Sequence, residues 1–149
     1  MSSGGKNPAL RAILDGEWGR ASRAKRIAEW IAAERGYRWV GIYEVTATEI
    51  GMIACTGSTL PSFPRFPVTR GLCAAAVASK SIVNVGDVRE DARWLETFGS
   101  TRAEIIVPVP DDGGRVTGLV DVDSDRVNAF GAGDEQFLLR CATEIGCLF

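Results

Sequence analysis

The chain has 149 residues, of which 46% are hydrophobic and 24% charged, and its formal net charge is -2. A chain of this length forms one domain that buries roughly two-thirds of the surface its unfolded form exposes. The slightly acidic balance argues against nucleic acid as a partner, and the lack of a ~20-residue apolar stretch or a signal peptide argues against a membrane, so a cytoplasmic location is expected.

The first third of the chain predicts an extension, a helix and a hairpin. We expect residues 1–19 to form an N-terminal extension that is partly helical or disordered, and residues 20–149 to form the single domain. A helix is predicted over 22–36, because apolar residues recur there at i, i+3, i+4 and i+7 and a glycine follows. Segments 37–45 and 49–55, joined by a short polar turn, predict two paired strands.

The middle of the chain alternates irregular and regular segments. Three prolines between residues 56 and 69 exclude a helix and predict a loop with a short edge strand. The small residues of 71–81 predict a helix suited to close packing against a sheet, and a short strand follows within 81–85. Residues 88–101 predict a loop with one helical turn.

The last third predicts a second hairpin and a terminal helix. Strands at 102–109 and 115–124 flank the turn DDGG, and a helix begins near Gly133, with acids in its first turn where the helix dipole favours them. This order of elements describes an α+β domain in which helices pack against an antiparallel sheet. The two terminal helices are expected to pair on one face.

The strand GLVDVDS carries Asp121 and Asp123 on one face, because successive strand side chains point to opposite sides. That face is either solvated or lines a site. Glu104 lies in an otherwise apolar strand, and a third acid near the other two would repel them unless a cationic group lies between. An amine-bearing ligand meets this requirement, and clustering is expected to raise at least one pKa of the three.

The chain has four cysteines and no histidine. The absence of histidine excludes Ser-His-Asp triads, Cys-His pairs and histidine-ligated zinc. The cysteines lack CxxC spacing, so we expect free thiols, no metal site and no cofactor. We interpret Cys55, Cys141 and Cys147 as structural, the latter two near the apolar stripe of the terminal helix. Cys73 taken alone is most simply a small buried hydrophobic residue.

The block GLVDVDS, followed by AFGAGDEQFLLRCA, resembles the closing strand and helix of GAF domains. More narrowly, RWVGIYEV, TRGLCAAAVASKSIVNVGDV, RAEIIVPV and GLVDVDS together resemble the free methionine-(R)-sulfoxide reductases, which are small stand-alone GAF proteins. The likeness runs from about Trp39 to Ile145. It implies a GAF-like fold, with the N- and C-terminal helices on one face of a central antiparallel sheet and a loop-capped ligand pocket on the other.

The resemblance also implies a set of ligand-binding residues. In those reductases a Trp and a Tyr line the pocket, and three carboxylates hold the polar groups of free methionine sulfoxide. The residues at the matching positions, together with a threonine at the position of a family cysteine, are Trp39, Tyr43, Thr97, Glu104, Asp121 and Asp123. Core packing is the alternative interpretation of the two aromatic residues.

The cysteines depart from the family pattern. Of three positions that typically hold cysteine, only Cys73 matches, and the other two are Phe63 and Thr97. Sulfoxide reduction needs a thiolate that attacks the sulfur, an acid that protonates the oxygen, and a second thiol that removes the resulting sulfenic acid. If Cys73 is catalytic here, an external thiol has to resolve it.

Three apolar residues, Trp94, Leu95 and Phe98, lie in an otherwise charged segment. They predict either a lid that closes over a ligand or a loop anchored by its aromatic side chains.

Three functions stay open at this level. We favour a GAF domain that binds a small polar, amino-acid-like ligand without full reductase activity. The first alternative is a free methionine-(R)-sulfoxide reductase in which Cys73 is catalytic and an external thiol resolves it. The second is an interaction module that forms a homodimer through its terminal helices and has no ligand.

Overall fold

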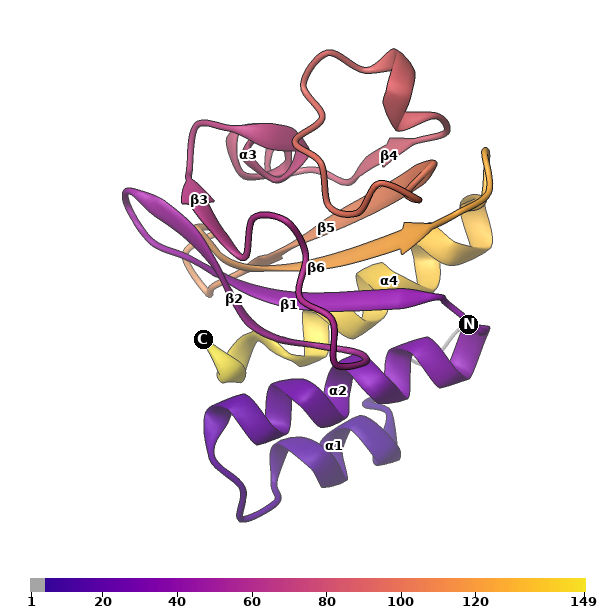
Figure 1. The fold of residues 1–149 in the computed structure, drawn as a ribbon. Helices are drawn as coiled ribbons and strands as arrows, with labels where there is room; N and C mark the ends of the chain where they lie inside the picture. Colours follow the sequence, from indigo (N-terminus) through magenta and orange to yellow (C-terminus); the bar gives the residue numbers. More distant parts are fainter. Residues whose placement is uncertain (1–4) are drawn as a thin grey trace.

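The computed structural model describes residues 5–149, which contain a six-stranded sheet with helices on both faces (Figure 1). The strands are β1 (Trp39–Val45), β2 (Glu49–Cys55), β3 (Arg65–Pro67), β4 (Val83–Val85), β5 (Ala103–Pro110) and β6 (Val116–Ser124). Their order across the sheet is β3-β2-β1-β6-β5-β4, and each neighbouring pair is antiparallel. The predicted α+β architecture is confirmed.

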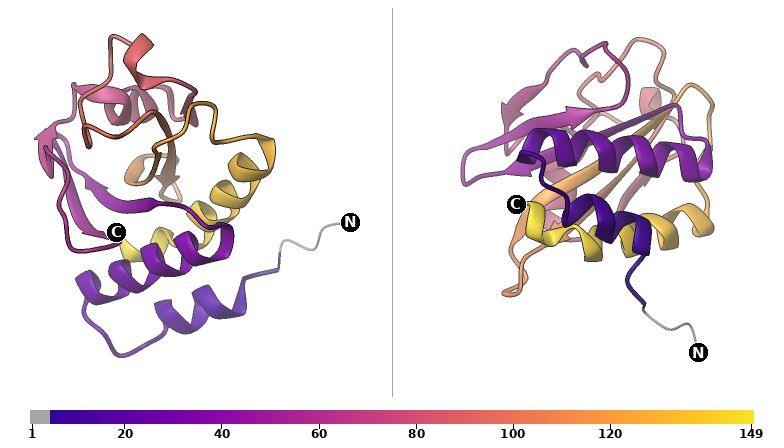
Figure 2. Two further views of the ribbon diagram at one scale, coloured as in Figure 1. Left: turned by 45° about the vertical axis from the view of Figure 1, so that its right-hand side comes forward. Right: turned by 90° about the horizontal axis from the view of Figure 1, so that it is seen from below.

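The helices divide between the two faces of the sheet. They are α1 (Pro8–Leu14), α2 (Arg20–Arg35), α3 (Gly71–Ser79) and α4 (Ala132–Glu144), with 3-10 turns η1 (Val88–Glu90) and η2 (Gly146–Leu148). Figure 1 and Figure 2 show α2 and α4 under the sheet with α1 below them, whereas α3 and the long loops lie on the opposite face. The predicted placement of the terminal helices on one face is confirmed. Within residues 5–149, no helix combines the length and apolar character that a membrane span requires.

Helix α2 follows the predicted periodicity. Its residues Ala24, Ile27, Ala28 and Ile31 are fully buried against the sheet. The helix ends at Gly36, whose φ of 68° is left-handed and favours glycine, and the Gly36 backbone N–H donates to the carbonyl of Ala32. The chain can therefore turn directly from α2 into β1.

Helix α1 packs against α2 and α4 on their side away from the sheet. The Asn7 side chain caps it by accepting hydrogen bonds from the backbone N–H groups of Ala9 and Leu10, and the Asn7 backbone N–H donates to Glu144 Oε1 at 2.7 Å. Leu10 and Leu14 are buried in the core beneath the sheet. Residues 1–4 of the predicted extension lie outside the described residues, and the division of the chain at residue 19 stays a prediction.

The sheet separates two apolar clusters. On the side of α2 and α4 the strands contribute residues such as Val40, Ile105 and Val122, and on the α3 side they contribute Ile106 and Leu119. Strand β6 lies in the middle of the sheet and is buried along nearly all of its length. Its two faces therefore both matter, one for packing and the other for the acidic residues described below.

The apolar stripe of the terminal helix continues past the end of the helix itself. Helix α4 ends at Glu144 and the 3-10 turn η2 follows, so the residue spacing changes and Leu148 is buried while Cys147 is exposed. Cys147 Sγ lies 4.0 Å from Arg11 Nη2. The apolar placement expected for Cys147 is therefore wrong, whereas Cys55 and Cys141 are buried.

We expect Gly41→Ala to destabilise the protein. A Cβ at Gly41 would lie 2.6 Å from Trp39 Cη2 and 2.9 Å from Tyr43 Cε2, so two buried rings on β1 would have to move. Such overpacking costs about 1–3 kcal/mol, which denaturant-induced unfolding measures as a lower free energy of unfolding.

The matched control is Gly113→Ala in the β5-β6 turn. There the new Cβ makes an ordinary 3.5 Å contact with Asp111 Oδ1, so the expected change is within about 0.5 kcal/mol. Equal stability of the two variants would contradict the close packing of the rings over Gly41.

Candidate functional site

Three adjacent strands direct the predicted acidic and aromatic residues to the α3 side of the sheet. In the antiparallel register, Asp123 on β6 lies opposite Trp39 on β1 and opposite Glu104 on β5, and Asp121 lies opposite Gly41. Side chains directly opposite each other have Cβ atoms roughly 5 Å apart. The alternation that buries Val120 and Val122 under the sheet therefore gathers the acids above it.

All three carboxyl groups are buried. The exposed fractions of Glu104, Asp121 and Asp123 are 3%, 2% and 3%, so the solvated alternative for this face is wrong. Within residues 5–149 none of them forms an ion pair with Lys or Arg, and Glu104 Oε2, Asp121 Oδ1 and Asp123 Oδ1 have no hydrogen-bond partner. A buried carboxylate without a partner is costly, so this cluster requires a proton or a cation.

Burial is the main cause of a raised pKa at each of these acids. It raises the pKa of Glu104, Asp121 and Asp123 well above the ordinary range, and repulsion from a neighbouring carboxylate of the cluster adds to the rise at each. The Thr101 hydroxyl donates a 3.0 Å hydrogen bond to Asp123 Oδ2 and opposes the rise there. The cluster therefore favours protonated carboxyls at pH values where exposed acids are ionised, as predicted for at least one of them.

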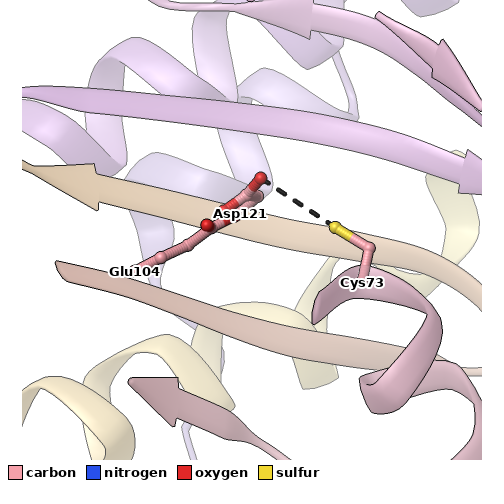
Figure 3. Close-up of side chains that lie close together, drawn as sticks. All are labelled: Cys73, Glu104 and Asp121. Atoms are coloured by element: carbon pink, nitrogen blue, oxygen red, sulfur yellow. Dashed lines mark hydrogen bonds between the residues drawn. The ribbon is translucent and has the colours of Figure 1, made fainter. Parts of the chain in front are cut away.

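Cys73 lies beside the acids, in the first turn of α3. Figure 3 shows its thiol pointing at Asp121, and the distance from Cys73 Sγ to Asp121 Oδ2 is 4.0 Å. Burial raises the pKa of the Cys73 thiol well above its ordinary value, and the carboxylates of Asp121 and Glu104 raise it further. The start of a helix favours a thiolate, but here burial and negative charge outweigh that effect.

Three side chains are close enough to share one metal ion. One ligand atom each from Cys73, Glu104 and Asp121 lies within 4.8 Å of the other two. The sequence predicted no metal site, because these residues come from α3, β5 and β6 and show none of the short spacings that identify metal motifs. Only the register of β5 with β6 and the position of α3 bring them together.

Two cavities divide the predicted site residues between them. An inner cavity of about 20 Å³ is lined by residues that include Tyr43, Cys73, Thr97, Glu104 and Asp121. An outer cavity of about 340 Å³ is lined by residues that include Trp39, Phe98, Thr101 and Asp123. The inner one has room for about one water molecule, whereas the outer one is within the size range of small-molecule sites.

Two loops that line the inner cavity are joined to each other. The backbone N–H of Ser62 donates to the carbonyl of Thr97 at 2.9 Å, and the Ser62 hydroxyl lies 3.4 Å from Glu96 Oε2. Phe98 packs edge-on against Trp39, with ring centroids 5.3 Å apart. The aromatic residues thus anchor the loop in this conformation, and its opening as a lid stays a prediction.

The structure adds Thr101, which sequence reasoning missed because no spacing identifies it; its hydroxyl is directed at Asp123. The indole of Trp94, a residue of the predicted lid or anchored loop, lies near Glu104, although its Nε1 has no hydrogen-bond partner within residues 5–149. Phe63, Cys73 and Thr97, the residues at the three positions for which the resemblance implies cysteine, all line the inner cavity.

Comparison with known proteins places these features in a family context. The chain is 28% identical over 140 residues to GAF domain-containing protein A of Dictyostelium discoideum, covering 89% of this chain and 83% of that relative. It is 27% identical over 122 residues to the free methionine-R-sulfoxide reductase of Saccharomyces cerevisiae, covering 74% of this chain and 63% of the yeast protein. The matched part is thus less than two thirds of the length of the yeast enzyme.

Solved structures show the same fold. The type II free methionine-R-sulfoxide reductase from Thermoplasma acidophilum has a TM-score of 0.81 at 31% identity, covering 87% of this chain and 91% of that one. The free methionine-R-sulfoxide reductase from Neisseria meningitidis, solved in complex with its substrate, has a TM-score of 0.83 at 27% identity, covering 95% and 83% of the two chains. The GAF domain family matches residues 20–147. The chain therefore belongs to the GAF domain family.

Proposed function

We propose that the acidic and aromatic pocket binds a free amino acid that carries a cationic amine, of the methionine sulfoxide kind. The observation that carries this proposal is the set of three buried carboxyl groups, each with an oxygen that has no partner within residues 5–149. A ligand ammonium group offers three donors and a positive charge. It therefore satisfies the unpaired oxygens and removes the repulsion between the acids at the same time.

The pocket also offers donors to a ligand. Trp39 Nε1 is buried and has no hydrogen-bond partner within the described part of the chain, and Trp39 lines the outer cavity together with Asp123. An indole N–H only donates, so it requires an acceptor such as a sulfoxide or carboxylate oxygen. Acceptors and donors side by side suit a zwitterion better than a simple cation.

Binding requires the covering loops to move. A free amino acid is much larger than one water molecule, so it does not fit the inner cavity of about 20 Å³ as it stands. The Ser62 to Thr97 hydrogen bond joins the two loops that line that cavity, and the Phe98 to Trp39 contact fixes the same part of the chain at the outer cavity. The outer cavity reaches Trp39 and Asp123 and provides the approach for the ligand.

We expect methionine sulfoxide to raise the thermal unfolding temperature of the protein, because a ligand that binds only the folded state stabilises it by about 2.7 kcal/mol at a hundredfold excess over its Kd. N-acetyl methionine sulfoxide lacks the charged amine and should give a much smaller shift. Asp121→Asn should also reduce the shift, whereas Asp112→Asn in the exposed β5-β6 turn should not. Equal shifts with the free and acetylated compounds would refute recognition of the amine.

A second candidate function is reduction of the bound sulfoxide at Cys73. It is supported by the 4.0 Å separation of Cys73 Sγ and Asp121 Oδ2 and by relatives that are named free methionine-R-sulfoxide reductases. The Cys73 sulfur would attack the sulfoxide sulfur, and the oxygen would pass to Cys73 as a sulfenic acid while methionine leaves. One external thiol then forms a mixed disulfide and water, and a second thiol releases Cys73 and an external disulfide.

The ligand itself would activate the thiol. Asp121 and Glu104 disfavour the Cys73 thiolate, and a bound ammonium group would neutralise their charge. The position of Cys73 at the start of α3 then favours the thiolate. A carboxyl group of the cluster that has kept its proton can donate it to the sulfoxide oxygen.

We expect methionine formation from methionine-(R)-sulfoxide and dithiothreitol to be lost in Cys73→Ser and retained in Cys147→Ser, which removes an exposed thiol. Thr97→Cys places a second thiol on the inner cavity and should increase turnover several-fold at low dithiothreitol, because it can resolve the sulfenic acid. Amino acid analysis of the product measures both effects. No turnover in the wild-type chain, together with a thermal shift by the same compound, would leave binding as the function and exclude reduction.

We expect stability to fall as pH rises above the ordinary carboxyl range. A group with a raised pKa keeps its proton in the folded protein after the unfolded chain has lost it. The contribution of these groups to the free energy of unfolding is therefore greatest below about pH 4. At higher pH it declines by up to about 1.4 kcal/mol per pH unit for each retained proton. Denaturant titrations from roughly pH 5 to pH 8 measure the decline.

Glu104→Gln removes one of these groups and should flatten the decline, whereas Glu17→Gln changes an exposed carboxyl and should not. A wild-type curve parallel to that of Glu104→Gln across this range would contradict the raised pKa of Glu104.

The homodimer through the terminal helices stays a prediction.

A further inference from the structure

We propose that Cys73, Glu104 and Asp121 form a three-ligand site for a thiophilic divalent cation, such as Zn²⁺, in the inner cavity. The three side chains come from α3, β5 and β6 and converge at one point, as Figure 3 shows. This inference concerns an inorganic ion and does not depend on the proposed amino acid ligand.

The distances are close to those of a tetrahedral site. Zinc binds thiolate sulfur at about 2.3 Å and carboxylate oxygen at about 2.0 Å, which separates the two ligand atoms by roughly 3.5 Å. Cys73 Sγ and Asp121 Oδ2 are 4.0 Å apart, and all three ligand atoms lie within 4.8 Å of one another. Binding of the ion would require the side chains to rotate and draw these atoms closer together.

The unpaired oxygens provide independent support for a ligand at this point. Glu104 Oε2 and Asp121 Oδ1 are buried and have no hydrogen-bond partner in residues 5–149, and both residues are more than nine-tenths buried. Both line the inner cavity together with Cys73, and that cavity has a volume of about 20 Å³. Its size suits a single ion or water molecule, so a metal ion fits without movement of the loops.

The ligand set selects the class of ion. Magnesium and calcium need six or more oxygen ligands, whereas zinc accepts sulfur and oxygen in a four-coordinate site. Two carboxylates and one thiolate supply three ligands, and because the cavity has room for the ion alone, the second oxygen of one carboxylate would supply the fourth. Binding releases the Cys73 thiol proton to solvent and places a double positive charge between the acids.

The first test uses Co²⁺ as a spectroscopic probe on the metal-free wild-type chain. We expect one ion per chain and a near-ultraviolet thiolate-to-cobalt charge-transfer band that Zn²⁺ displaces and Mg²⁺ does not. Cys73→Ser should abolish the band, whereas Cys147→Ser, which removes the exposed thiol, should retain it. No band in the wild-type chain, a band that survives in Cys73→Ser, or a band lost in Cys147→Ser would overturn the proposal.

Carboxyl variants test the remaining ligands and leave every cysteine in place. Glu104→Gln and Asp121→Asn should each weaken Co²⁺ binding at least roughly tenfold, since even residues that only support metal ligands matter that much. Asp112→Asn should bind as the wild type does. Circular dichroism checks that each variant is folded; if Cys73→Ser is not, unchanged affinity in both carboxyl variants overturns the proposal and weakened affinity supports it.

Discussion

Three carboxyl groups share one buried face of the sheet, and within residues 5–149 no Lys or Arg pairs with them. Ionised groups in such a place are costly, so their charge has to be removed by protons or balanced by a cation. The raised pKa of Glu104, Asp121 and Asp123 is a consequence of this requirement. This need for a proton or a cation determines what the inner cavity, the buried Cys73 thiol and the covering loops can bind.

The pleat of the sheet allows the fold to tolerate this cost. On β6, Val120 and Val122 pack on the α2 and α4 side while Asp121 and Asp123 face the cavities. The apolar side contributes roughly 1.5–3 kcal/mol for each large side chain that is fully buried. Alternate residues of β6 pack in the core and line the cavities, so the packing that stabilises the strand also fixes the positions of the acids.

Some of this arrangement is predictable from sequence and some is not. Residue periodicity located α2, and strict alternation in GLVDVDS placed Asp121 and Asp123 on one face. The closeness of Glu104 to Asp123 depends on the β5-β6 register, and that of Cys73 to Asp121 depends on how α3 packs. Residues that are far apart in the sequence but close in space produce no local periodicity. The division into two cavities depends on loop conformations, which prolines and aromatic residues restrict but do not determine.

The conformation of the loops determines which cation the three acids can bind. A proton needs no space, and a metal ion fits a cavity of about 20 Å³ and can also use the Cys73 sulfur. An ammonium group attached to an amino acid needs the loops to open, but it brings further contacts with Trp39 and the outer cavity. The proton, the metal ion and the ammonium group neutralise the same negative charge, so their binding is mutually exclusive. Selectivity follows from shape and from the thiol, because charge alone does not distinguish them.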